Sequence, residues 1–262
     1  MRVNLAEWGS GAPVVLLHGL TGSTAYLRPL AELLAGTHRV IAPDLPGHGG
    51  TALPAGLTIE ASAHLLADAC AQLGVERPVV IGHSFGAPIA VAWAAQRPVA
   101  GVAACSPVGM APLALRRARF VLPFHRALAA TEPWWGAAAV TRPLPRRAVF
   151  GWFVGMAQLD GLDAGMGRAM LRAAAASADA VLPALDALAQ LELPGLCAAV
   201  DAPALVLWGE RDRSGWENGP PLAAALHASE VVLPGVGHMP MLEAPYGVAV
   251  AVRELLSATV RA

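Results

Sequence analysis

Short runs of apolar residues alternate with helical patterns through the first hundred residues and again near the C-terminus. The continuous apolar runs at 14–17 and 79–81 are typical of parallel strands that are buried on both faces. Further strands are predicted at 39–42, 99–104, 204–208 and 231–233, with an edge strand at 2–8, and helices at about 25–34, 58–73, 86–97, 220–227 and 245–257. This alternation predicts an α/β fold with a mostly parallel sheet of about seven strands and helices on both faces.

The alternation stops between residues 108 and 200, where no buried strand is predicted. Helical patches rich in Ala, Leu and Arg are interrupted there by prolines, and aromatic and Met side chains are frequent. We therefore expect a helical cap at 108–200 that covers the C-terminal ends of the strands. The core that carries this insertion is expected to consist of 1–107 and 201–262.

The segment Gly82-His83-Ser84-Phe85-Gly86 stands between a predicted strand and an Ala-rich helix. Glycine has no Cβ, so Gly82 and Gly86 allow a sharp turn and a close approach of the strand to the helix. Such a turn raises the hydroxyl of Ser84 above the edge of the sheet.

Two further chemically active side chains follow strands: Asp212 after 204–208 and His238 after the last strand. The carboxyl ends of parallel strands meet at one edge, where α/β proteins bind their ligands. A Ser hydroxyl needs a neighbouring base, imidazole titrates in the right range, and a carboxylate orients the imidazole. Asp201 and Glu210 are alternative acids, but Asp201 precedes the strand, and we favour Asp212.

The composition excludes several classes of protein. A formal net charge of -1 argues against a nucleic-acid binder. The chain is also rich in apolar residues, with 55% hydrophobic and only 14% charged residues. The apolar run at 78–96 is better explained as strand, turn and helix than as a membrane span, and no signal peptide is expected. Three widely spaced cysteines predict neither a disulfide framework nor a metal site, so we expect a cytoplasmic location.

The chain resembles the α/β-hydrolase superfamily over nearly its whole length. The order Ser84, Asp212, His238 matches the order of nucleophile, acid and base in that superfamily. The other matching motifs are His18-Gly19, Asp44-Leu45-Pro46-Gly47-His48-Gly49, Gly82-His83-Ser84-Phe85-Gly86, Gly209-Glu210-Arg211-Asp212 and Gly237-His238. The resemblance implies that Ser84 is the nucleophile, His238 the general base and acid, and Asp212 its orienting partner. It also implies an oxyanion hole formed by the backbone N–H groups of Leu20 and Phe85. We expect His18, His48 and Asp44 to have structural roles in shaping the loops.

The expected activity is that of a serine hydrolase that cleaves an ester of a fairly hydrophobic small molecule through an acyl-enzyme, without metal or organic cofactor. A Ser at the turn excludes the Asp-nucleophile chemistry of haloalkane dehalogenases and epoxide hydrolases. Thioester or C–C hydrolysis, perhydrolysis, and elimination on a natural-product intermediate remain open, as does a non-catalytic ligand receptor. Candidate substrate-binding residues are His83, Trp134, Trp135, Trp152, Met156 and Met239, although for His83 local packing or hydrogen bonding is the favoured role.

One stretch of the expected cap has an uneven charge. Between residues 108 and 150 there are seven Arg and a single acid, Glu132. This pattern is typical of a solvated helical face, but it also fits a basic rim that attracts an anionic substrate, an acyl carrier or a lipid surface. The arginines are Arg116, Arg117, Arg119, Arg126, Arg142, Arg146 and Arg147.

Overall fold

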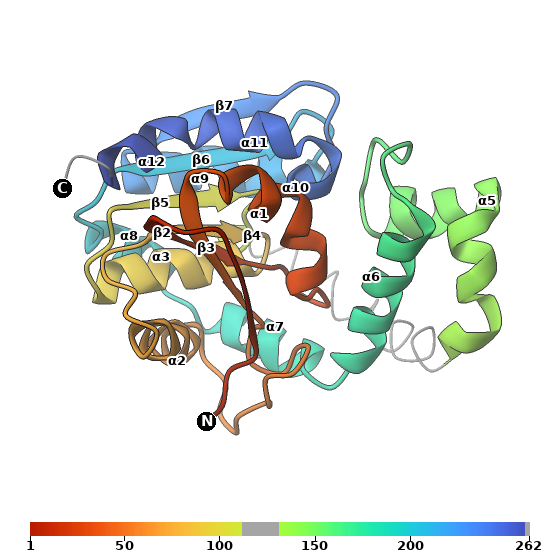
Figure 1. The fold of residues 1–262 in the computed structure, drawn as a ribbon, viewed down its shortest axis with the longest axis horizontal. Helices are drawn as coiled ribbons and strands as arrows, with labels where there is room; N and C mark the ends of the chain where they lie inside the picture. The colour runs from red at the N-terminus through yellow and green to blue at the C-terminus, as the bar shows by residue number, and fades with distance from the viewer. Residues whose placement is uncertain (112–130, 260–262) are drawn as a thin grey trace.

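A seven-stranded sheet lies at the centre of the computed structural model, which describes residues 1–111 and 131–259 (Figure 1). The strand order is β1-β3-β2-β4-β5-β6-β7, in which β1 is antiparallel to β3 and every other neighbouring pair is parallel. The predicted mostly parallel sheet of seven strands is therefore confirmed. The strands are β1 (Leu5–Trp8), β2 (Ala12–Leu17), β3 (His38–Pro43), β4 (Val79–His83), β5 (Gly101–Cys105), β6 (Ala204–Gly209) and β7 (Ser229–Leu233).

The continuous apolar runs arise because both faces of the sheet are covered. Along β2, Val14 and Leu16 contact one hydrophobic cluster, whereas Val15 and Leu17 contact a second cluster on the opposite face. Neither set is exposed to solvent, and polar residues at alternate positions are therefore not needed.

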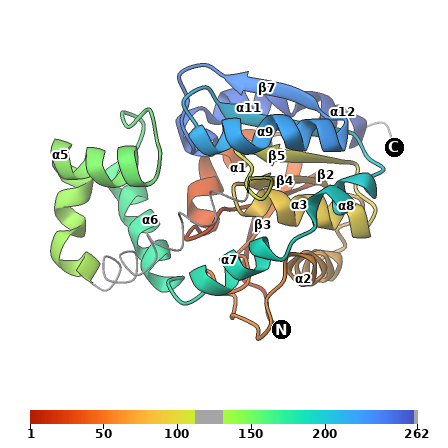
Figure 2. The ribbon, with the colours of Figure 1, turned by 180° about the vertical axis from the view of Figure 1, so that it is seen from behind.

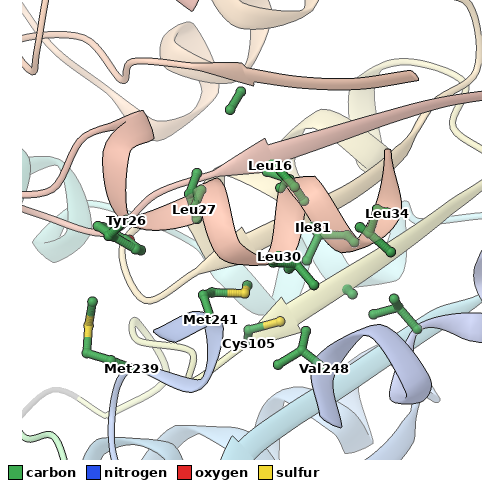
Figure 3. Close-up of a cluster of buried hydrophobic side chains, with 14 of the residues drawn as sticks. Leu16, Tyr26, Leu27, Leu30, Leu34, Ile81, Cys105, Met239, Met241 and Val248 are labelled. Carbon is green, nitrogen blue, oxygen red and sulfur yellow. The ribbon is translucent and has the colours of Figure 1, made fainter. Parts of the chain in front are cut away.

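Helices form a layer on each face of the sheet (Figures 1 and 2). Figure 3 shows one of the two interfaces, in which Leu16 and Ile81 of the sheet lie next to Leu27 and Leu30. This face is covered by helices α1 (Arg28–Leu34), α11 (Pro245–Ala251) and α12 (Arg253–Thr259). The 3-10 helix η1 (Thr24–Leu27) directly precedes α1. The other face carries α2 (Ile59–Ala71), α3 (Gly86–Gln96), α8 (Leu193–Ala198) and α9 (Arg213–Leu226).

Helix α9 begins earlier than the sequence pattern predicts. The expectation of a helix starting at Pro220 is wrong, because α9 starts at Arg213 and contains Pro220 and Pro221 in its interior. The carboxylate of Asp212 accepts the backbone N–H of Ser214 and so caps the helix at its N-terminus. Asp212 therefore lies at the junction of a strand end and a capped helix, which fixes its side chain.

The described part of the insertion between β5 and β6 consists of helices joined by loops, and it contains no strand. Residues 131–141 are helical and are followed by α5 (Pro143–Arg146), the π-helix η2 (Arg147–Phe153) and α6 (Ala164–Ala176). Figures 1 and 2 show α5 and α6 beyond one end of the sheet. Next comes α7 (Val181–Ala189), which packs into the cluster of α2 and α3.

The division into a cap at 108–200 and a core stays a prediction. Within it, α7 and α8 contact the core helices, since Leu185 and Cys197 belong to the buried clusters around α3. In the described residues no helix is both long and apolar enough to span a membrane.

Candidate active site

The turn between β4 and α3 places Ser84 in a strained conformation. Its backbone φ is 51°, in the left-handed region that residues other than glycine rarely adopt. Two glycines make this turn possible. A Cβ on Gly82 would lie 2.2 Å from the carbonyl oxygen of Gly86, and one on Gly86 would lie 2.6 Å from that of His18. Strand, sharp turn and helix therefore occur as predicted from the motif.

Three predicted residues from separate strand ends form one hydrogen-bonded series. The Oγ of Ser84 lies 3.1 Å from Nε2 of His238. On the other side of the ring, Nδ1 lies 3.1 Å from both carboxylate oxygens of Asp212. A carboxylate only accepts, so Nδ1 carries the hydrogen and Nε2 is left to accept the proton of Ser84.

Ser214 also joins this series, although it was not predicted as a site residue. Its hydroxyl donates to Oδ1 of Asp212 at 2.8 Å, and its Oγ lies 2.9 Å from Nδ1 of His238. The backbone N–H of Ser214 bonds the same carboxylate oxygen at 3.0 Å. The spacing Asp-x-Ser at a helix start is the signal that could have identified this contact.

The charges of Asp212 and His238 depend on each other. Burial raises the pKa of the Asp212 carboxyl, but the charge and hydrogen bond of His238 outweigh burial, and the net pKa lies below its ordinary value. For His238 burial lowers the pKa, yet the carboxylate of Asp212 dominates and the net pKa is raised above 6.5. Asp212 is therefore an anion, and it stabilises the protonated form of His238.

The expected oxyanion donors lie in loops that contact Ser84. The loop after β2 reaches the nucleophile, since a Cβ on Gly19 would lie 3.0 Å from Cβ of Ser84. In the described part of the chain, no acceptor bonds the backbone N–H of Leu20 or of Phe85. Both groups are thus available to a ligand, as an oxyanion hole requires.

Buried histidines fix the loop after β2, in agreement with the structural role expected for them. His18 has one ring nitrogen 2.8 Å from the carbonyl oxygen of Gly19, and its Nε2 accepts the N–H of Leu45. His48 accepts the N–H of Thr21 at 3.2 Å. Burial lowers the pKa of His18 to about 3, so this ring is neutral and able to accept.

His83 connects the two sides of the site. Its Nε2–H donates to the carbonyl oxygen of His238 at 2.7 Å, which leaves Nδ1 to accept the hydroxyl of Tyr26 at 2.8 Å. Tyr26 in turn accepts the backbone N–H of Gly19. His83 is 2% exposed and both of its ring nitrogens are engaged, which fits the local role expected for it better than contact with a substrate.

Tyr26→Phe tests this connection. The change removes the partner of two buried groups, Gly19 N–H and His83 Nδ1, and each unsatisfied group costs about 1–3 kcal/mol. We expect the free energy of unfolding to fall by about 2–4 kcal/mol in urea denaturation. The chain has two tyrosines, and the matched control Tyr246→Phe changes an exposed ring. Equal stability of the two variants would mean that the Tyr26 hydroxyl does not join these groups.

A cavity of about 1030 Å³ opens beside His238. Of the expected substrate-binding residues, Trp152 and Met156 line it, whereas Trp134, Trp135 and Met239 are not among its described lining residues. Trp134 is exposed to solvent, and Met239 is buried in the core cluster (Figure 3). Ser84 is not among the described lining residues either, but its Oγ lies within hydrogen-bond distance of His238, which does line the cavity.

The expected basic rim is only partly visible. Arg116, Arg117, Arg119 and Arg126 lie outside the described residues. Arg146 does not belong to a free rim, because its guanidinium donates to the carbonyl oxygens of Leu159 and Leu162. Arg147 lines the cavity, and Arg142 is exposed.

The three cysteines are buried, and none of them forms a disulfide in the described part of the chain. Burial raises the pKa of the Cys70 thiol to about 12 and that of Cys197 to about 11, so neither is a thiolate at neutral pH. Across the described ranges 1–111 and 131–259, no group of three His, Cys, Asp or Glu side chains is arranged to hold a metal ion.

Comparisons with known proteins bear on the family and the fold of the chain. Residues 14–252, which include all three residues of the hydrogen-bonded series, match the model described as "Alpha/beta hydrolase family". A thermophilic esterase from Thermogutta terrifontis superposes with a TM-score of 0.74 and 27% identity, over 98% of this chain and 93% of that chain.

Two curated relatives match over shorter segments. The 2-hydroxy-6-oxo-2,4-heptadienoate hydrolase of Pseudomonas putida is 37% identical over 103 residues, or 37% of each chain. Epoxide hydrolase 3 of Siraitia grosvenorii is 36% identical over 94 residues, or 34% of this chain and 30% of that protein. The chain spans 27–36% of the length of the first curated relatives that it matches.

Proposed function

The chain belongs to the alpha/beta hydrolase family, and we propose that it is a serine hydrolase that cleaves an ester of a fairly hydrophobic small molecule. The observation that carries this proposal is the hydrogen-bonded series from Ser84 through His238 to Asp212. A Ser hydroxyl is a weak nucleophile at neutral pH, and this arrangement supplies both the base and the group that orients the base.

The first half of the reaction uses each group in turn. His238 Nε2 takes the proton of Ser84 as Oγ attacks the ester carbonyl carbon. The imidazolium that forms is stabilised by the anionic carboxylate of Asp212. Negative charge develops on the carbonyl oxygen, and in this proposal the backbone N–H groups of Leu20 and Phe85 donate to it.

The second half reverses the proton transfers. His238 gives its proton to the departing alcohol, which leaves an acyl group on Ser84. The same imidazole then takes a proton from water, the hydroxide attacks the acyl carbonyl, and Ser84 leaves with the proton restored. The acyl-enzyme is thus formed and hydrolysed by one set of side chains.

The preference for a hydrophobic ester rests on the walls of the cavity. Apolar side chains contributed by the π-helix η2 and the loop after it line the cavity beside His238. They are Trp152, Phe153, Val154, Met156 and Leu159.

Other reactions of the family reuse the same groups. The named activity of the Pseudomonas putida relative motivates C–C hydrolysis as a second candidate. The similarity to an epoxide hydrolase does not transfer that reaction, because this chain has Ser84 at the turn instead of an Asp. A receptor without turnover is the remaining alternative.

Steady-state kinetics on p-nitrophenyl esters of increasing chain length separate these alternatives. Turnover that rises with acyl length and disappears in Ser84→Ala supports the proposed esterase. Tight ligand binding without turnover supports a receptor. Cleavage of a vinylogous diketone with no turnover of any ester supports C–C hydrolysis.

The pH dependence of kcat/KM follows from the shifted pKa of His238. The base must be neutral in the free enzyme, and Asp212 raises the pKa of His238 above 6.5 despite burial. We therefore expect kcat/KM to rise with increasing pH, with the midpoint of its acidic limb above 6.5. A profile of kcat/KM for one ester from about pH 5 to pH 9 measures this midpoint. A midpoint at or below the ordinary value would contradict the coupling to Asp212.

A further inference from the structure

One carboxylate outside the hydrogen-bonded series joins the loop of His238 to the insertion. Glu243 ends the short helix α10 (Pro240–Glu243) and is partly buried. Its Oε1 accepts the backbone N–H of Met239 at 3.0 Å, and its Oε2 accepts that of Gly237 at 3.0 Å. The two residues that flank His238 are therefore held by one side chain.

The same carboxylate also holds the loop after η2. Its Oε2 accepts the N–H of Ala157 at 2.7 Å and that of Gln158 at 2.9 Å. The carboxylate of Glu243 thus accepts four backbone N–H groups. Hydrogen bonds to a carboxylate are charge-assisted and stronger than bonds between neutral groups. Glu243 is thus the common partner of two loops that lie about 80 residues apart in the chain.

The two loops are in direct contact around this carboxylate. The backbone N–H of His238 donates to the carbonyl oxygen of Gly155 at 2.9 Å. A Cβ on Gly237 would lie 2.3 Å from that same oxygen, so only glycine permits the contact. Helix α10 is itself anchored, because the neighbouring Met241 is fully buried in the core cluster (Figure 3).

We infer that Glu243 is a positioning residue that locks the loop of His238 to the segment 155–158, so that docking of this segment and alignment of the base over Ser84 are coupled. This inference rests on the proposed function for its effect on catalysis. The coupling of the two loops stands on the hydrogen bonds alone.

The charge of Glu243 provides a second readout. Burial lowers the pKa of His238, whereas the carboxylates of Asp212 and, after it, Glu243 raise it. The facing ring of His83 lies 5.3 Å away between centroids and is neutral, because burial lowers its pKa to about 3. The other charged groups around the cavity are Arg147, Asp160, Arg211 and Arg213.

Glu243→Gln keeps the shape of the side chain and removes its charge. A Gln oxygen can accept at the Oε2 position, but its NH₂ group then opposes the N–H of Met239. We expect kcat for p-nitrophenyl butyrate to fall by about tenfold or more, with KM changed by less than about threefold. The acidic limb of kcat/KM is expected to move to lower pH, which a merely structural role would not produce.

Amide hydrogen exchange tests the coupling without reference to activity. In Glu243→Gln the amides of Ala157, Gln158, Gly237 and Met239 are expected to exchange about tenfold faster or more. The matched control Glu230→Gln changes an exposed carboxylate on β7 that makes no bond to either loop, and it should leave all four rates as in the wild type. Faster exchange at Gly237 and Met239 alone would overturn the coupling.

The wild-type protein supplies a test that does not depend on how the variant folds. If the carboxylate locks both loops, the four amides open together and their protection factors agree within about threefold. Much weaker protection of Ala157 and Gln158 would show that the segment undocks without the loop of His238, and would overturn the inference. A wild type with coupled amides but no hydrolase activity would refute the proposed function and leave the lock intact.

Discussion

Ser84→Ala is expected to lower kcat/KM for p-nitrophenyl butyrate by about 10³- to 10⁶-fold. The variant lacks the Oγ that lies 3.1 Å from His238 Nε2, so no acyl-enzyme can form. Residual hydrolysis would come from the free N–H groups of Leu20 and Phe85 and from substrate binding. Alanine at a φ of 51° keeps the strain of the turn, and we expect the fold to persist.

Labelling by a fluorophosphonate probe checks the same point independently of the substrate. The wild type and the exposed control Ser10→Ala should be labelled, and Ser84→Ala should not. Circular dichroism and thermal unfolding confirm that each variant is folded. Equal labelling of Ser84→Ala and the wild type would place the reactive hydroxyl elsewhere, and no labelling of a folded wild type would refute an activated nucleophile.

Asp212→Asn is expected to lower kcat/KM by about 10⁴-fold with little change in the fold. The carboxylate now accepts from Nδ1 of His238 and from the hydroxyl and N–H of Ser214. An amide can present its NH₂ group to Nδ1, which favours the tautomer with hydrogen on Nε2. That tautomer cannot take the proton of Ser84, and the imidazolium also loses its counter-charge.

Two neighbouring acids are matched controls for Asp212. Asp201→Asn changes an exposed residue that precedes β6. Glu210→Gln changes a side chain whose Oε2 accepts the N–H of Gly235. Each is expected to retain kcat/KM within about threefold of the wild type. A loss in either variant as large as that in Asp212→Asn would mean that the acid has been assigned to the wrong residue.

The positions of the strands were accessible from the sequence because burial on both faces leaves a strong local signature. A run such as 14–17 contains no polar position, and only a strand covered on both faces tolerates that pattern. The turn at Ser84 was accessible for a similar reason, since the close contacts of Gly82 and Gly86 leave no room for a Cβ. In both places a local requirement determines the residue type.

The helical insertion was harder to predict from the sequence, because its hydrophobic pattern does not indicate which part of the protein each helix face contacts. Trp134 and Trp152 are large apolar residues, yet both are exposed, and only Trp152 lines the cavity beside His238. Arg146 belongs to a stretch whose composition is typical of a solvated helical face, but its guanidinium donates to two backbone carbonyl oxygens. The start of α9 was predicted wrongly because Pro220 and Pro221 were interpreted as the first turn of a helix. In the structure Asp212 caps the helix, which begins at Arg213.

The sequence by itself determined the fold class and the turn at Ser84, and it singled out His238 and Asp212, because each depends on local chain chemistry at a strand end. Only the tertiary structure decided which side chains surround them. Tyr26 and Glu243 act on the site through contacts between segments that are distant in the chain. No periodicity or motif encodes such contacts, because they exist only after the sheet brings the strand ends to one edge.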